Sequence, residues 1–249
     1  MPFPVALQPY TVRDELARDY FGTLSRIAEI GYQGVELGPP PATLSIDSLK
    51  QHLERINLKV IGSHAPLTEL TNSLDAQVAY LHQVGGSYLA LSHRFGSRQE
   101  VLDAARIFEQ IGQRCRELGV QFLYHNHNWE FTRFDGDYAL DILLEATHPD
   151  LLKMELDTYW VQRGGADPVA YLRKLHGRCP LLHIKDMEPG EEQFFAEVGE
   201  GVLDWGAILQ EAEAAGTEWL VVEQDRCRRP VFESIAISYR NLQKLRAIK

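Results

Sequence analysis

Eight short apolar segments recur along the chain at intervals of roughly 30 residues, and each has the length of a buried β-strand. Amphipathic segments lie between them. Ile107, Ile111 and Cys115, for example, are spaced to share a helix face that ends at Gly119, a residue type common at helix C-termini. The strand segments are PVALQ (4–8), GVELG (34–38), KVIGSH (59–64), YLALSH (88–93), QFLYHNH (121–127), LKMELDTYW (152–160), PLLHIKD (180–186) and WLVVEQD (219–225).

The regular alternation of strands and helices predicts the fold class. Further helical segments are expected at 24–28, 78–84, 140–144, 169–175, 208–215 and 235–245. Eight strand–helix units within 249 residues favour one (β/α)8 TIM barrel that forms a single domain over residues 1–249. A doubly wound open sheet is the alternative, since it is built from the same units.

Composition narrows the choice of partners. A formal net charge of -10 opposes binding to nucleic acid and favours a small-molecule substrate. The three cysteines are widely spaced, which is typical of reduced thiols in a cytoplasmic protein. The N-terminal MPFPVALQPY lacks the features of a signal peptide, and no apolar stretch approaches the length of a membrane span. We therefore expect a cytoplasmic protein without a membrane partner, while homo-oligomer formation stays open.

Polar residues stand two apart at the C-terminal end of four consecutive strand segments. Because side chains alternate faces along a strand, residues two apart point the same way. In a TIM barrel these strand ends meet at the face that carries the active site, so the polar groups would converge there. The pairs are His125 and His127, Glu155 and Asp157, His183 and Lys185, and Glu223 and Asp225.

Such a collection of groups indicates a site for a metal ion. Nitrogen and carboxylate ligands without thiolate favour Mn²⁺, Mg²⁺, Co²⁺ or Zn²⁺. A single histidine at a strand end, such as His64, is more often a hydrogen-bonded structural residue, and Glu155 can equally serve to orient a ligand. The aromatic residues Trp129, Tyr159 and Trp160 fit either a sugar-stacking surface or ordinary packing. We retain His64, Trp129 and Glu155 as candidate substrate-binding residues.

The order and spacing of several segments make the chain resemble the sugar phosphate isomerase/epimerase superfamily of xylose isomerase-like TIM barrels. This superfamily includes tagatose 3-epimerases, inosose dehydratases, dehydroshikimate dehydratases and an apurinic endonuclease branch. The resemblance covers nearly the whole chain. It is carried by ALQPYTVRD, IAEIGYQGVELG, SHAPL, YHNHNWEF, LDTYWV, HIKD, EVGEGVLDW and VVEQD.

The resemblance implies a set of metal ligands. In the epimerases of this superfamily, Glu, Asp, His and Glu from four successive strands hold one divalent ion, commonly Mn²⁺, and the two glutamates also act as acid and base. The matching ligands here are Asp157, His183 and Glu223. The position of the first glutamate holds His125, as in inosose dehydratases, so the fourth ligand is either His125 or Glu130 from the following loop. Mn²⁺ is the expected ion, with Mg²⁺, Co²⁺ and Zn²⁺ as alternatives.

A divalent ion that chelates a carbonyl and an adjacent hydroxyl makes the neighbouring proton acidic, because it stabilises the enediolate. Glu223 is expected to carry that proton, with His127, Lys185 and Glu130 as further catalytic candidates. We therefore expect a metal-dependent isomerase or epimerase of a keto sugar or cyclitol. A dehydratase or lyase acting on a keto sugar, inosose or 3-keto glycoside is the alternative, which an imidazole of pKa about 6.5 in place of a carboxylate slightly favours.

Two other classes of protein share parts of this pattern. A sugar-binding barrel without turnover would keep the pocket but lack the first glutamate of the epimerases. An endonuclease for abasic DNA would need a three-metal cluster with more histidine and glutamate ligands, and the acidic charge of this chain opposes such a substrate.

Overall fold

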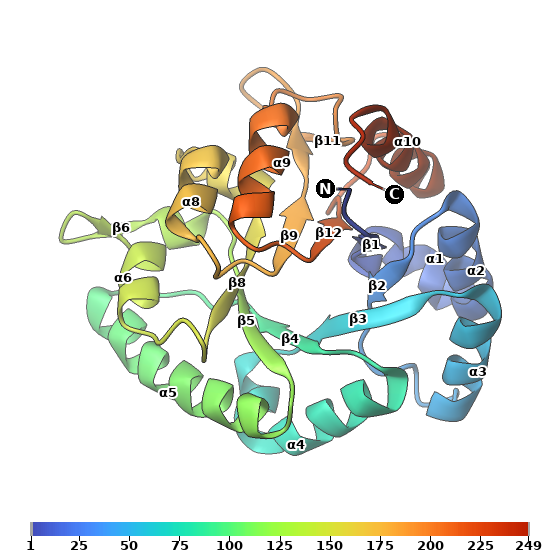
Figure 1. The fold of residues 1–249 in the computed structure, drawn as a ribbon, viewed down its shortest axis with the longest axis horizontal. Helices are drawn as coiled ribbons and strands as arrows, with labels where there is room; N and C mark the ends of the chain where they lie inside the picture. Colours follow the sequence, from blue (N-terminus) through green and yellow to red (C-terminus); the bar gives the residue numbers. More distant parts are fainter. Residues whose placement is uncertain (1, 249) are drawn as a thin grey trace.

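Eight parallel strands close into a barrel in the computed structural model, which describes residues 2–248 (Figure 1). The strands are β1 (Val5–Leu7), β2 (Gly34–Glu36), β3 (Lys59–His64), β4 (Tyr88–Leu91), β5 (Gln121–His125), β8 (Lys153–Asp157), β9 (Leu181–Ile184) and β12 (Trp219–Val222). Each predicted strand segment supplies one of them. The barrel closes because β1 pairs in parallel with both β2 and β12. The predicted TIM barrel is confirmed, and an open sheet is excluded.

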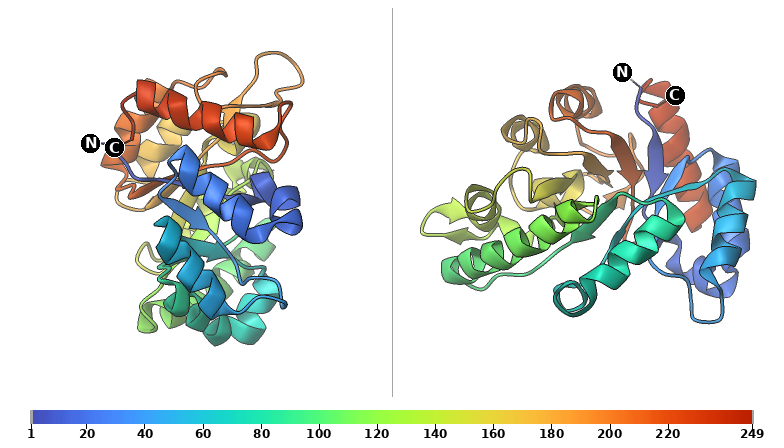
Figure 2. Two further views of the ribbon diagram at one scale, coloured as in Figure 1. Left: turned by 90° about the vertical axis from the view of Figure 1, so that its right-hand side faces the viewer. Right: turned by 60° about the horizontal axis from the view of Figure 1, so that its bottom comes forward.

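Helices surround the barrel. They are α1 (Arg13–Arg18), α2 (Tyr20–Ile30), α3 (Ile46–Ile56), α4 (Leu67–Val84), α5 (Arg98–Glu117), α6 (Ala139–Glu145), α7 (Thr158–Arg163), α8 (Pro168–Lys174), α9 (Trp205–Ala214) and α10 (Val231–Lys244), with 3-10 turns η1 (Pro9–Val12) and η2 (Trp129–Phe131). The first and last segments of the described residues lie side by side (Figure 2), and the N–H of Phe3 donates to the Ala247 carbonyl at 2.7 Å. No helix within residues 2–248 has the length and apolar character that a membrane crossing requires.

The apolar face of α5 follows the predicted spacing except at one position. On α5, Ile111 and Cys115 are buried, but Ile107 is 37% exposed. Residues four apart drift around a helix of 3.6 residues per turn, so Ile107 falls outside the stripe that faces the strands. Three helices, α1, α3 and α7, lie outside the helical segments that the sequence pattern predicts.

Helix α7 replaces the end of a predicted strand. The segment 152–160 was expected to be extended, but β8 ends at Asp157 and α7 begins at Thr158. The Asp157 carboxylate accepts the backbone N–H of Trp160 at 2.9 Å through Oδ1. This N-cap satisfies a donor that the first helical turn leaves free, and it outweighs the strand preference of Tyr159 and Trp160.

The segment between β9 and α9 is held by one buried carboxylate. It contains the short antiparallel pair β10 (Asp186–Met187) and β11 (Phe195–Ala196). A second such pair, β6 (Arg133–Phe134) and β7 (Asp137–Tyr138), precedes α6. Asp186 accepts the backbone N–H groups of Gly199, Gly201 and Leu203 and the indole N–H of Trp205, at 2.6 to 3.2 Å. Position 201 requires glycine, because a Cβ would lie 2.2 Å from Asp186 Oδ1.

Candidate active site

Strand parity carries polar side chains into the barrel interior. Leu123 and Leu181 belong to a small apolar cluster inside the barrel, and His125 and His183, two residues further along, point the same way. They lie at the C-terminal ends of the strands, where TIM barrels carry their active sites. A cavity of about 400 Å³ opens there, with a wall that includes His64, His125, His127, Glu223 and Asp225.

A larger hollow of about 620 Å³ lies at the opposite end of the barrel, around Lys59, Tyr88 and Trp219. A hydrogen bond runs across part of its wall, from the Tyr88 hydroxyl to Glu218 at 2.7 Å. Neither group of metal-ligating side chains found within residues 2–248 borders this hollow. The C-terminal cavity is therefore the candidate active site.

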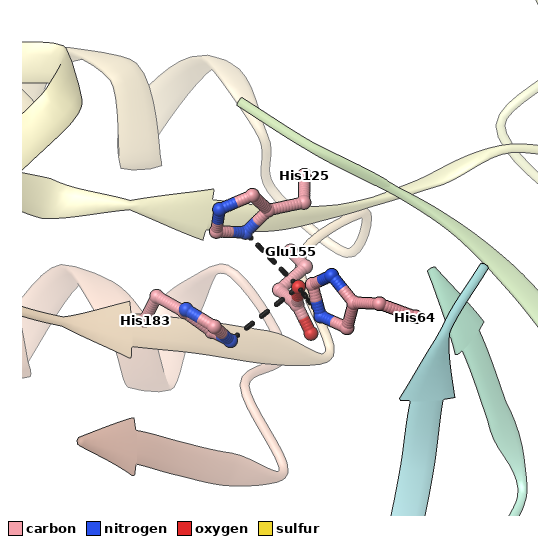
Figure 3. Close-up of side chains that lie close together, drawn as sticks. All are labelled: His64, His125, Glu155 and His183. Atoms are coloured by element: carbon pink, nitrogen blue, oxygen red, sulfur yellow. Dashed lines mark ion pairs between the residues drawn. The ribbon is translucent and has the colours of Figure 1, made fainter. Parts of the chain in front are cut away.

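Three histidines converge on one carboxylate oxygen in this cavity (Figure 3). Nε2 of His64, Nδ1 of His125 and Nε2 of His183 lie 2.8, 3.0 and 3.4 Å from Glu155 Oε2. None of the three contacts is aligned as a hydrogen bond, and both oxygens of Glu155 lack a hydrogen-bond partner although the side chain is buried. His64 is the member that solvent reaches, with a side chain 30% exposed.

A second buried carboxylate, Glu36, joins this group from β2. Its Oε2 lies 2.6 Å from His183 Nε2, accepts from the Gln8 amide at 3.2 Å, and lies 3.4 Å from His64 Nε2. Glu36 is not among the site residues predicted from the sequence. The available signal was a charged residue inside the apolar run GVELG, because a buried carboxylate requires a partner of opposite charge or a metal ion.

Lys185 forms the centre of a separate group of carboxylates. Its fully buried ammonium lies 3.0 Å from Asp157 Oδ2, 2.7 Å from Glu223 Oε2 and 3.2 Å from Asp225 Oδ1. The ring of Phe195 covers it, with the centroid 5.7 Å from Nζ. These three carboxylates outweigh burial and raise the pKa of Lys185 above its usual range, so its positive charge is permanent.

His183 links the two groups through its two ring nitrogens. Nδ1 lies 3.2 Å from Glu223 Oε2, whereas Nε2 faces Glu36 and Glu155. Burial alone would raise the pKa of Glu223, but Lys185 and His183 hold it well below 4.5. Glu223 is therefore an ionised carboxylate on the cavity wall.

The histidine charges are set by their surroundings. For His64, burial lowers the pKa, but Glu155 and Glu36 raise it to about 10. Burial and the neighbouring His183 keep the pKa of His125 well below 6.5. Burial and Lys185 lower the pKa of His127 to about 3. Neither imidazole of the HNH segment has the pKa of about 6.5 that we expected, because neither is solvated.

The rest of the HNH segment fixes the shape of the site. Asn126 accepts the backbone N–H of Asp157 at 2.9 Å, which joins the end of β5 to the end of β8. The His127 ring stacks on Trp129 with centroids 4.0 Å apart, and Trp160 lies 5.5 Å away. Trp129 and Trp160 thus pack around His127 at the rim of the cavity.

Glu130 lies behind the cavity and belongs to neither group. One oxygen is 2.7 Å from the Tyr124 hydroxyl, and the other accepts the backbone N–H of His127 at 2.8 Å. Burial raises the pKa of Glu130 to about 7. The Tyr124 hydroxyl also lies 2.7 Å from the His93 carbonyl, which can only accept. Since tyrosine has one proton to donate, a protonated Glu130 satisfies both contacts.

Within residues 2–248, two sets of four side chains could each hold a metal ion. In each set, all the ligand atoms lie within 4.8 Å of one another, and Glu130 belongs to neither set. Carboxylates, and imidazoles that have lost the proton from the ligating nitrogen, are suitable donors for a divalent ion, and unpartnered buried atoms at His125 and Glu155 fit such a ligand role. The first set is His125, Asp157, His183 and Glu223, which the resemblance implies, and the second is His64, His125, Glu155 and His183.

Known proteins share the sequence pattern and the fold of this chain. An inosose dehydratase from Lacticaseibacillus casei is 25% identical over 250 residues, covering 82% of each chain. A sugar phosphate isomerase/epimerase from Parabacteroides distasonis superposes with a TM-score of 0.86 at 25% identity, over 99% of this chain and 100% of the other. The fold is also that of the IOLI protein solved with a zinc atom, with a TM-score of 0.75 at 15% identity over 98% of each chain.

Both closer relatives are enzymes, which confirms the expectation that this chain is one. The model of the xylose isomerase-like TIM barrel family matches residues 24–246, nearly the whole length. The chain belongs to the xylose isomerase-like TIM barrel family.

Proposed function

We propose that the protein is a divalent-metal-dependent enzyme that removes the proton next to the carbonyl of a keto sugar or keto cyclitol, after which the hydroxyl on the next carbon takes up that proton and leaves as water. The observation that carries this proposal is the arrangement of Glu223. Its ionised carboxylate lines the cavity, and His183, which belongs to both candidate ligand sets, lies beside it. A base thus stands next to the place where a carbonyl would be polarised.

A divalent ion bound beside His125 and His183 would act as a Lewis acid on the substrate carbonyl and make the adjacent C–H more acidic. Glu223 accepts the proton. Lys185, 2.7 Å from Glu223, keeps that carboxylate ionised before the transfer and adds positive charge near the developing negative charge of the substrate. His127, neutral and at the rim, is placed to donate an N–H hydrogen bond to a substrate hydroxyl.

The distribution of carboxylates favours elimination over epimerisation. Glu223 and Asp225, the two carboxylates on the cavity wall, both follow the end of β12. They approach a substrate from one side, whereas epimerisation requires proton transfer on both faces of the same carbon. The similarity to an inosose dehydratase supports elimination as well. Epimerisation is the second candidate, because the Parabacteroides distasonis structure is described as an isomerase/epimerase.

Turnover in deuterated water tests the proposal. The protein, loaded with Mn²⁺, Co²⁺ or Zn²⁺ in turn, is incubated with ketoses, inososes and 3-keto glycosides, and products are followed by NMR. A dehydratase gives an unsaturated or deoxygenated product, whereas an epimerase gives deuterium at the carbon next to the carbonyl without loss of water. Absence of both with every substrate and ion would refute the proposal and favour a non-catalytic sugar-binding barrel. An abasic duplex, included as a separate substrate, tests the endonuclease alternative.

A further inference from the structure

We infer that the divalent ion of this cavity is held by a set of three imidazoles and one carboxylate that differs from the set the family resemblance implies: His64, His125, Glu155 and His183. The inference rests on the proposed function only for the presence of an ion, and it does not depend on the reaction. Lys185 takes the place of a metal ion at the family-like position.

The spacing of the ligand atoms supports this set. A tetrahedral ion with nitrogen and oxygen ligands at about 2.0–2.1 Å keeps those ligand atoms about 3.4 Å apart. The three imidazole nitrogens lie 2.8, 3.0 and 3.4 Å from Glu155 Oε2 (Figure 3). The four side chains thus already have nearly the spacing of a coordination shell. His64 Nε2, His125 Nδ1 and both oxygens of Glu155 are buried without a well-aligned hydrogen-bond partner, which suits atoms that bind an ion.

The two carboxylates of the other set already have partners. Asp157 caps α7 with Oδ1 and pairs with Lys185 through Oδ2, while Glu223 Oε2 lies 2.7 Å from the same ammonium. An ion bound to these oxygens would lie within about 5 Å of a buried positive charge. Lys185 is completely buried, so it has no solvent position to which it can withdraw.

The orientation of His183 gives independent support. Its Nδ1 is directed at Glu223 and its Nε2 at Glu155 and Glu36. Metal-binding histidines usually donate their other ring N–H to a carboxylate, which fixes the tautomer and the ring. Glu223 then orients His183 rather than binding the ion. Glu36, 2.6 Å from Nε2, stands beside the set and supplies the second negative charge that balances a dication.

The ligand types also bear on the identity of the ion. Three imidazoles and one carboxylate are a set that suits Zn²⁺ or Co²⁺ better than Mg²⁺ or Mn²⁺, which prefer oxygen ligands. The resemblance alone implies Mn²⁺. His64 is partly exposed, and the cavity therefore offers a path by which the ion can enter.

Metal affinity of matched variants tests the assignment. Zn²⁺ and Co²⁺ binding to the full chain is measured by competition with a chelator for wild type, Glu155→Gln, His64→Ala and, as the control, Asp157→Asn. We expect Glu155→Gln and His64→Ala to weaken binding by more than roughly 100-fold, and Asp157→Asn by less than about 10-fold. The visible spectrum of bound Co²⁺ should change in His64→Ala and persist in Asp157→Asn.

A reversed order of affinities, or a wild-type chain that binds neither ion, would overturn the inference. Circular dichroism and thermal melting check the fold, and His64→Ala carries the test if the buried Glu155→Gln variant does not fold. The proposed function is tested separately from the metal site. If the affinities follow the expected order but no sugar or cyclitol reacts, the metal site stands and the reaction does not.

Discussion

Replacing Lys185 with methionine removes a buried ammonium that faces three carboxylates. Asp157, Glu223 and Asp225 lie 2.7 to 3.2 Å from it, and methionine fills a similar volume without charge. Removing one partner of a buried ion pair leaves an uncompensated charge and typically costs about 3–5 kcal/mol. We expect the free energy of unfolding of the metal-free protein to fall by about that amount.

The loss should depend on pH. Lys185 is the main positive charge that holds the pKa of Glu223 below 4.5 against the effect of burial. In the wild type, the lowered pKa of Glu223 stabilises the fold at pH values above the pKa that Glu223 has in the unfolded chain. This stabilisation is lost as the pH falls through the folded-state pKa. In Lys185→Met the pKa of Glu223 rises instead, which destabilises the fold at high pH. The difference between the two proteins should be largest near about pH 8 and narrow as the pH falls towards about 4.5.

Urea unfolding with a chelator present, at several pH values, measures this difference. Lys174→Met is the matched control, because Lys174 pairs with Asp141 at 3.2 Å on the surface with a side chain 54% exposed. A surface pair of this kind contributes about 0–1 kcal/mol. Equal losses in both variants, or a Lys185→Met loss that does not change with pH, would refute the reasoning.

Three further predictions concern single carboxylates. Glu223→Gln should lower turnover by roughly 10²- to 10⁴-fold while retaining the ion, and near wild-type kcat would assign the base to another residue. Glu130→Gln should become more stable than the wild type as the pH rises, because a pKa of about 7 makes ionisation of Glu130 costly in the folded state. The difference in the free energy of unfolding should change by up to about 3 kcal/mol from acidic to alkaline pH. Denaturant unfolding at both pH values checks this, and a pH-independent difference would contradict it. Asp186→Asn should cost about 1.5–3 kcal/mol and speed hydrogen exchange within residues 186–205, whereas uniform loss of protection would contradict a local role.

The sequence determined the strands and the direction of the strand-tip side chains. Each apolar run is a local feature, and the two-residue period of a strand is independent of the remainder of the fold. That period is sufficient to place His125 and His183 on one face, two residues beyond the apolar residues Leu123 and Leu181. The two-residue period does not show that the strand ends at Asp157. There the Asp157 side chain caps the N-terminus of α7, and this cap outweighs the strand propensity of the residues that follow.

Tertiary structure decided which polar groups meet. Glu36 and Glu155 lie 119 positions apart in the sequence, and only barrel closure brings both against His64 and His183. The low pKa of His127 likewise follows from burial and from Lys185, which approaches from another strand. Distances between strand ends and the loss of solvent are properties of the closed barrel, so the side-chain types were readable from the sequence whereas their partners and charges were not.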